Sequence, residues 1–102
     1  MTEHRESDFE IGVMVDVGEG AGALVIYTSE ALRGDEIEIS PLDDDTRRVH
    51  TDVLRRRNAA GYVYAAVFGS LAAGGYRLWH LSHPDAPEVH IVSGQVVEVD
   101  WR

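Results

Sequence analysis

The stretch YVYAAVFGSLAAGGYRLW, residues 62–79, decides the fold class of this chain. Residues 62–68 are almost all apolar and rich in aromatic and β-branched side chains, a composition that favours a strand. The glycine-rich segment 69–75 interrupts this pattern, and we expect it to form a loop in which Leu71 plugs the open end of a core. Residues 76–81 predict another strand, so the stretch indicates two β-strands joined by a loop.

Strand patterns continue along the rest of the chain. Alternating apolar residues predict strands over 9–17 and 35–40, the latter with Ile37 and Ile39 facing the core and Glu36 and Glu38 facing out. The remaining predicted strands are a central one over 23–28, a polar edge strand over 46–57 and a closing hairpin made of 88–92 and 96–101. Residues 29–34 predict only a short helical turn, with Ser29 as its cap and Gly34 as its stop. The pattern indicates an all-β sandwich of seven or eight strands, in one domain over 9–102 that follows a disordered tail over 1–8.

Composition excludes several functions. The chain has 102 residues, which fits one domain, and a formal net charge of −9 at pH 7. Such a surface repels phosphate backbones and anionic lipids, so we expect neither nucleic acid nor a membrane as partner. The absence of cysteine excludes disulfides, thiolate metal sites and a cysteine nucleophile. The polar N-terminal segment has no signal-peptide pattern, so we expect a cytoplasmic protein, and no sequence motif predicts a cofactor. All basic residues are arginine, a bias typical of a GC-rich, actinobacterial genome.

Within the opening stretch, an aromatic residue, a leucine, a glycine, a tyrosine and a second leucine follow at fixed spacing. They are Phe68, Leu71, Gly74 or Gly75, Tyr76 and Leu78. This pattern resembles prealbumin-like (transthyretin-like) domains, especially collagen-adhesin B-type and carboxypeptidase-regulatory-like domains, and extends over roughly residues 21–101. The resemblance implies an immunoglobulin/prealbumin-like sandwich.

Two activities accompany that resemblance, and each can be compared with this chain. The internal Lys–Asn isopeptide bond of collagen-adhesin domains cannot form, because the chain has no lysine. Transthyretin-related hydroxyisourate hydrolases end in Tyr-Arg-Gly-Ser, whereas this chain ends Val99-Asp100-Trp101-Arg102. The resemblance therefore implies the fold more strongly than either activity.

The segment LWHLSHPDAPEVH, residues 78–90, contains the candidate metal ligands His80, His83 and His90. Neutral imidazole binds Zn²⁺, Cu²⁺ or Ni²⁺, and a hairpin around residues 82–87 would bring His80 and His90 together, with Asp85 or Glu88 as a further ligand. The alternatives are surface histidines in a polar loop or a pH-sensitive surface, because a one-residue change of register moves His90 to the other face.

Arginines and a tryptophan are the candidate interface residues. Two arginine runs, 47–48 and 55–57 (Arg55, Arg56 and Arg57), form a basic strip that either grips an anion or lies in solvent, paired with Asp43–Asp45 and nearby glutamates. Trp79 faces out of the sheet as an interface residue or packs under the turn at 29–34.

Catalytic and calcium-binding readings have less support. His50 and Asp52 can share a strand face, and Ser40 and Ser70 are serines without a nucleophile motif. The acidic run 43–45 supplies too few oxygens for calcium and is interpreted as a solvated turn. We therefore expect a small, non-catalytic interaction or structural module that binds a protein partner or forms a homodimer. The alternatives are a small-ligand or divalent-metal protein using the His80–His90 hairpin and, third, a transthyretin-related hydrolase.

Overall fold

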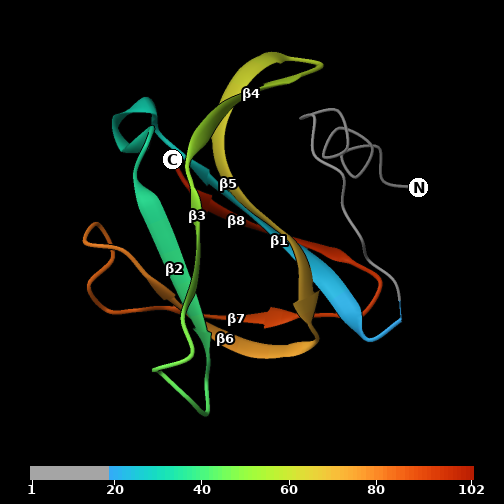
Figure 1. Ribbon diagram of the computed structural model, residues 1–102. Helices are drawn as coiled ribbons and strands as arrows, with labels where there is room; N and C mark the ends of the chain where they lie inside the picture. The colour runs from blue at the N-terminus through green and yellow to red at the C-terminus, as the bar shows by residue number, and fades with distance from the viewer. Residues whose placement is uncertain (1–18) are drawn as a thin grey trace.

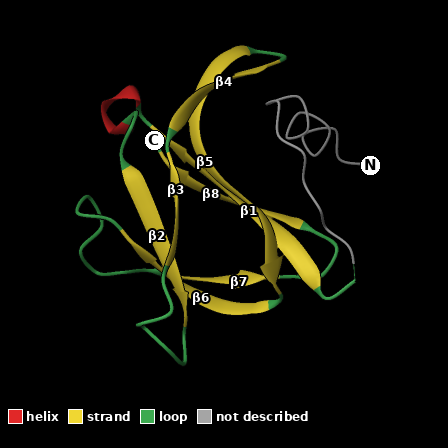
Figure 2. Ribbon diagram, viewed as in Figure 1, coloured by secondary structure: helices red, strands yellow, loops and turns green. Residues whose placement is uncertain are grey.

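The computed structural model describes residues 19–102, in which strands dominate and the prediction of an all-β sandwich is confirmed (Figures 1 and 2). The expected tail over 1–8 and strand over 9–17 lie outside the described residues. The strands of the described part are β1 (Ala21–Thr28), β2 (Glu36–Pro41), β3 (Val49–Asp52), β4 (Leu54–Asn58), β5 (Gly61–Ala72), β6 (Gly74–Trp79), β7 (Glu88–Ile91) and β8 (Val96–Trp101). No helix in this part of the chain has the length and hydropathy of a membrane span.

The strands form two four-stranded sheets packed face to face, with the orders β4-β5-β1-β8 and β3-β2-β6-β7. We call them the first and the second sheet. The β1 strand lies between β5, to which it is antiparallel, and β8, to which it is parallel. This placement confirms the central position expected from its uniformly apolar sequence, because a strand with apolar side chains on both faces is stable only when both faces are covered.

The main core lies between the sheets. Leu24 and Ile26 of β1 meet Ile37 and Ile39 of β2, and all four are completely buried. The alternation expected for β2 is confirmed, since Glu36 and Glu38 face outward from the same strand. Side chains of opposite parity on the first sheet form a separate buried cluster of small residues, namely Ala23, Val25, Ala65, Val67 and Val96.

The predicted single strand over 46–57 is wrong, because the chain crosses from one sheet to the other in its middle. The crossing residue is Val53, which is completely buried and separates β3 from β4. Its backbone N–H donates to the carbonyl of Asp35 (2.9 Å), and its carbonyl accepts from the N–H of Gly34 (2.8 Å). The buried valine side chain, which lies among polar neighbours, thus directs the chain inward at the point where it passes from one sheet to the other. The expected edge position is correct, since β3 and β4 each end a sheet order.

The predicted loop over 69–75 is also wrong. The β5 strand continues to Ala72, which pairs with Ala21, and β6 begins after a single residue. Leu71 therefore belongs to a strand, although it does pack against the main core as expected. The turn depends on Gly74, because its φ of +141° is an angle that glycine adopts more readily than other residues. The Tyr76 hydroxyl also stabilises the turn by donating to the Ala72 carbonyl (2.7 Å).

The turn after β1 is a short 3-10 helix, η1 (Glu30–Leu32), coloured red in Figure 2. The prediction that Ser29 caps it is only partly correct, because Ser29 holds the N-cap position without a side-chain hydrogen bond to the turn. Gly34 ends the turn with a φ of +89°, as expected for a glycine stop.

We predict that Gly22→Ala destabilises the fold. A Cβ on Gly22 would lie 2.5 Å from the Val92 carbonyl oxygen and 3.0 Å from that of Gln95, so backbone must move to admit it. We expect a loss of about 1 to 3 kcal/mol in the free energy of unfolding, measured by urea denaturation. Gly34→Ala is the comparison, because a Cβ there meets no atom within 4 Å and only the positive φ is penalised. A smaller loss for Gly22→Ala than for Gly34→Ala would contradict this close approach.

Candidate functional site

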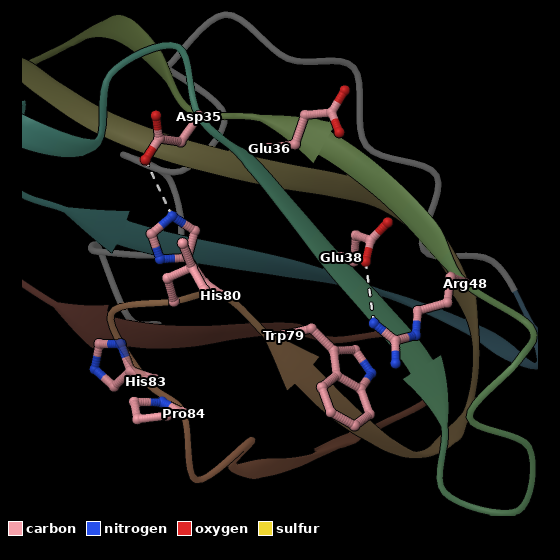
Figure 3. A pocket seen from close by; sticks show the side chains of 9 residues that line it. Asp35, Glu36, Glu38, Arg48, Trp79, His80, His83 and Pro84 are labelled. Atoms are coloured by element: carbon pink, nitrogen blue, oxygen red, sulfur yellow. Dashed lines mark hydrogen bonds and ion pairs between the residues drawn. The ribbon is translucent and has the colours of Figure 1, made fainter.

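A hollow with a volume of about 740 Å³ lies on the outer face of the second sheet (Figure 3). Strand alternation creates it: Ile37 and Leu78 point into the core, so Glu38 and Trp79 point out, and these two are direct partners in the β2–β6 register. The lining residues are Asp35, Glu36, Glu38, Arg48, Trp79, His80, Leu81, His83 and Pro84. We call this surface the acidic hollow.

Trp79 is held in a fixed position at one side of the acidic hollow. Its indole Nε1–H donates to the hydroxyl of Ser40 (2.9 Å), which is completely buried. The guanidinium of Arg48 lies 3.9 Å from the centroid of the indole ring and also donates to Glu38 (3.1 Å). Trp79 therefore lies in the outward-facing position of the two that the sequence allowed, as a platform that already carries one stacked guanidinium.

A chain of hydrogen bonds runs along the other side of the acidic hollow. His80 Nε2 lies 3.1 Å from the Asp35 carboxylate, while His80 Nδ1 accepts the backbone N–H of Ser82 (3.0 Å). A nitrogen that accepts an N–H carries no proton, so His80 is the Nε2–H tautomer and donates to Asp35. The Ser82 hydroxyl lies 2.8 Å from His80 Nδ1 and 2.9 Å from His83 Nδ1.

The order Asp35, His80, Ser82 has the connectivity of a hydrolase triad, but the hydrogen bonding is that of a structural turn. A general base needs a free lone pair for the serine proton, and the lone pair of His80 Nδ1 already accepts the Ser82 backbone N–H. The side chain of His80 is only 11% exposed, which suits a fixed support for the loop rather than a group that exchanges protons with a substrate.

His83 extends this chain to the last strand. Its ring stacks on that of Trp101 with centroids 3.9 Å apart and planes inclined by 11°. A β-bridge between His80 and His83 closes the turn. The stack thus attaches the wall of the acidic hollow, carried by the second sheet, to β8 of the first sheet.

The candidate metal ligands do not come together. The hairpin expected around residues 82–87 forms, but its register pairs His90 with Gly75 and Tyr76 with Val89. His90 is therefore displaced along β7 from His80, whose two nitrogens already have partners. Residues 19–102 contain no group of three or more His, Asp and Glu side chains arranged to hold a metal ion.

The basic strip at residues 55–57 lies on β4, at the edge of the first sheet and outside the acidic hollow. Arg55 and Arg57 lie over the ring of Tyr62, at 4.4 and 5.8 Å from its centroid. Arg56 turns inward to donate to the Ala65 carbonyl (3.1 Å), and its burial lowers the pKa of its guanidinium. The expected pairing with acidic side chains is confirmed for Arg48, which binds Glu38. The other salt bridges of the described arginines involve Arg77 and Arg102, and none involves residues 55–57.

The other candidate residues have structural positions. Ser40 is buried under Trp79, and Ser70 lies in β5. The Nε2 atom of His50, on β3, lies 3.7 Å from the carboxylate of Glu36 on the neighbouring strand β2. In the acidic run, the hydroxyl and the backbone N–H of Thr46 donate to Asp44 and hold the pKa of that carboxyl below its usual value. Asp45 lies 3.9 Å from Arg77.

The sequence analysis did not identify Asp35, Ser82 or Trp101 as parts of a site. Asp35 and His80 are 45 positions apart, and their contact follows from the antiparallel pairing of β2 with β6, which the sequence alone does not indicate. The sequence signal that could have indicated this site is the alternation that places Glu36, Glu38 and Trp79 at outward-facing strand positions. It places two carboxylates and an indole on one face, once β2 and β6 are known to be neighbours.

Comparison of the chain with protein-family models, curated proteins and solved structures found no match. The class that the fold defines is an all-β sandwich with an acidic hollow on one outer face.

We predict that His83→Ala weakens the attachment of the loop to β8. Loss of the stack on Trp101 should lower the free energy of unfolding by about 0.5 to 1.5 kcal/mol, measured by urea denaturation. His90→Ala serves as the control, because that exposed ring is opposite a glycine on the neighbouring strand. Equal effects of the two substitutions would show that the stack contributes nothing.

Proposed function

We propose that this chain is a small, non-catalytic interaction module that binds a basic segment of a protein partner in its acidic hollow. One observation carries the proposal: the carboxylates of Asp35, Glu36 and Glu38 line one hollow together with the Trp79 indole, and the ionisable lining otherwise contains only Arg48 and two histidines. On a chain with a net charge of −9, this arrangement attracts cations and repels anions.

The contacts within the acidic hollow suggest how an arginine or lysine of a partner would be held. The stack of Arg48 on Trp79 gives the geometry in which a guanidinium meets this ring. The Glu36 side chain is 60% exposed and the Asp35 side chain 49%, so both carboxylates remain open to a partner's donors. Leu81 is 95% exposed at the rim and offers an apolar contact beside them.

A prealbumin-like family, close to collagen-adhesin B-type and carboxypeptidase-regulatory-like domains, remains our proposal for the origin of the fold. It is supported by Phe68 and Tyr76, which both lie in the core between two four-stranded sheets. The other two functions conflict with the hydrogen bonds of His80, both of whose ring nitrogens have partners. Divalent-metal binding would require His80 to break one of these hydrogen bonds. A transthyretin-related hydrolase would require a histidine nitrogen that is free to act as a base. The interaction module requires neither change.

The test is a titration with an oligoarginine peptide, followed by tryptophan fluorescence and calorimetry. We expect saturable binding that weakens with added salt, because exposed charges are screened. The double substitution Glu36→Gln with Glu38→Gln should lower the affinity about fivefold to tenfold, as expected for the loss of two exposed charge pairs. An oligoglutamate peptide should not bind.

The matched control is Glu19→Gln with Glu30→Gln, which changes the net charge equally at exposed positions outside the acidic hollow. Equal weakening in both double variants would reduce the interaction to general charge attraction and refute a site. Light scattering of the purified protein distinguishes a separate partner from a second copy of the chain. Stoichiometric bound metal that depends on His80 would instead favour the metal-binding function.

A further inference from the structure

A second hollow, of about 420 Å³, opens at the edge where β3 of one sheet approaches β5 of the other. Its lining comes from both sheets, with Ile39 and Val49 on one side and Leu71 on the other. Val49 is 50% exposed, so apolar surface is open to solvent here. The volume lies within the range of small-molecule sites, which are mostly apolar with a few polar groups. We call this surface the intersheet hollow.

The charge of the intersheet hollow is opposite to that of the protein as a whole. Its charged lining consists of Arg47 and Arg48, without a carboxylate. Arg48 is already bound to Glu38 and stacked on Trp79. The charge of Arg47 acts on Asp44 and on the phenol of Tyr76, but the described salt bridges leave its guanidinium without a direct carboxylate partner.

The Arg47 guanidinium lies beside an apolar wall. Arg47 and the largely buried Tyr76 line the same hollow, and the charge of Arg47 opposes the rise in the pKa of Tyr76 that burial causes. A further hollow of about 340 Å³ shares both residues, so Arg47 borders two concave parts of the surface. A cation at the border of an aliphatic slot matches a ligand that has an anionic head and an apolar chain.

We propose that the intersheet hollow binds a free alkyl carboxylate. The alkyl chain lies against Val49 and Leu71, and the carboxylate accepts hydrogen bonds from Arg47. Aliphatic side chains dominate the wall, so a flexible chain fits the slot between the sheets. The two hollows share Arg48, but the proposed contact is made by Arg47, so the inference does not depend on the function proposed for the acidic hollow.

The test is calorimetry of the full chain with octanoate, together with methyl NMR spectra. We expect saturable one-to-one binding, with the largest shifts at the methyl groups of Val49 and Leu71. Arg47→Gln should lower the affinity about tenfold, whereas Arg55→Gln, at an exposed arginine on β4, should leave it unchanged. Acetate lacks the chain and octan-1-ol lacks the charge, so each should bind at least tenfold more weakly than octanoate.

A second pair of variants gives an independent reading. Val49→Asp places a carboxylate at the opening of the hollow and should abolish binding. Leu54→Asp, at a similarly exposed apolar residue of β4 in the other sheet, should not. Circular dichroism checks that each variant is folded. Equal octanoate binding by the Arg47→Gln and Arg55→Gln variants, or shifts centred on other methyl groups, would overturn the proposal. Absence of saturable binding to the unmodified chain would overturn it as well.

Discussion

The pair of backbone hydrogen bonds that Val53 makes with Gly34 and Asp35 is the constraint on which the rest of the structure depends. It holds the chain at the point where β3 leaves one sheet and β4 enters the other. It also fixes Asp35 at the start of β2, from where the carboxylate reaches His80 and positions the loop that follows β6. The wall of the acidic hollow is thus set by a contact made inside the core, and a loop that would otherwise be free in solution has a defined place.

Much of the fold was predictable because strand alternation is a local property. The parity of Ile37 and Ile39 and the central position of β1 follow from patterns within a few residues. The predicted closing hairpin over 88–92 and 96–101 is wrong, because β7 pairs with β6 and β8 pairs with β1, in different sheets. This error and the two over 46–57 and 69–75 arose where tertiary contacts decide the structure. Nothing in TRRVHTDVLRRR marks Val53 as the residue that enters the core, and the small residues around Leu71 predicted a loop although β1 pairs with them as a strand.

The candidate site was less predictable, because it depends on which strands are neighbours. The sequence indicated Trp79 and the histidines, but their partners Ser40, Asp35 and Trp101 come from distant positions in the chain. Register then separates His90 from His80, a result that cannot be derived from the spacing of the residues alone. The property of the site that the sequence does predict is its negative charge, because the outward positions of β2 carry glutamates and the chain as a whole is acidic.

The crossing at Val53 has one more consequence. Because β3 and β4 are consecutive parts of a single segment, the same short piece of chain forms the border of both sheets on that side of the sandwich. Neither sheet can lose this border strand without pulling on the other. Local fraying at one edge is thereby converted into strain on the whole molecule, and the domain is expected to open as one cooperative unit rather than sheet by sheet.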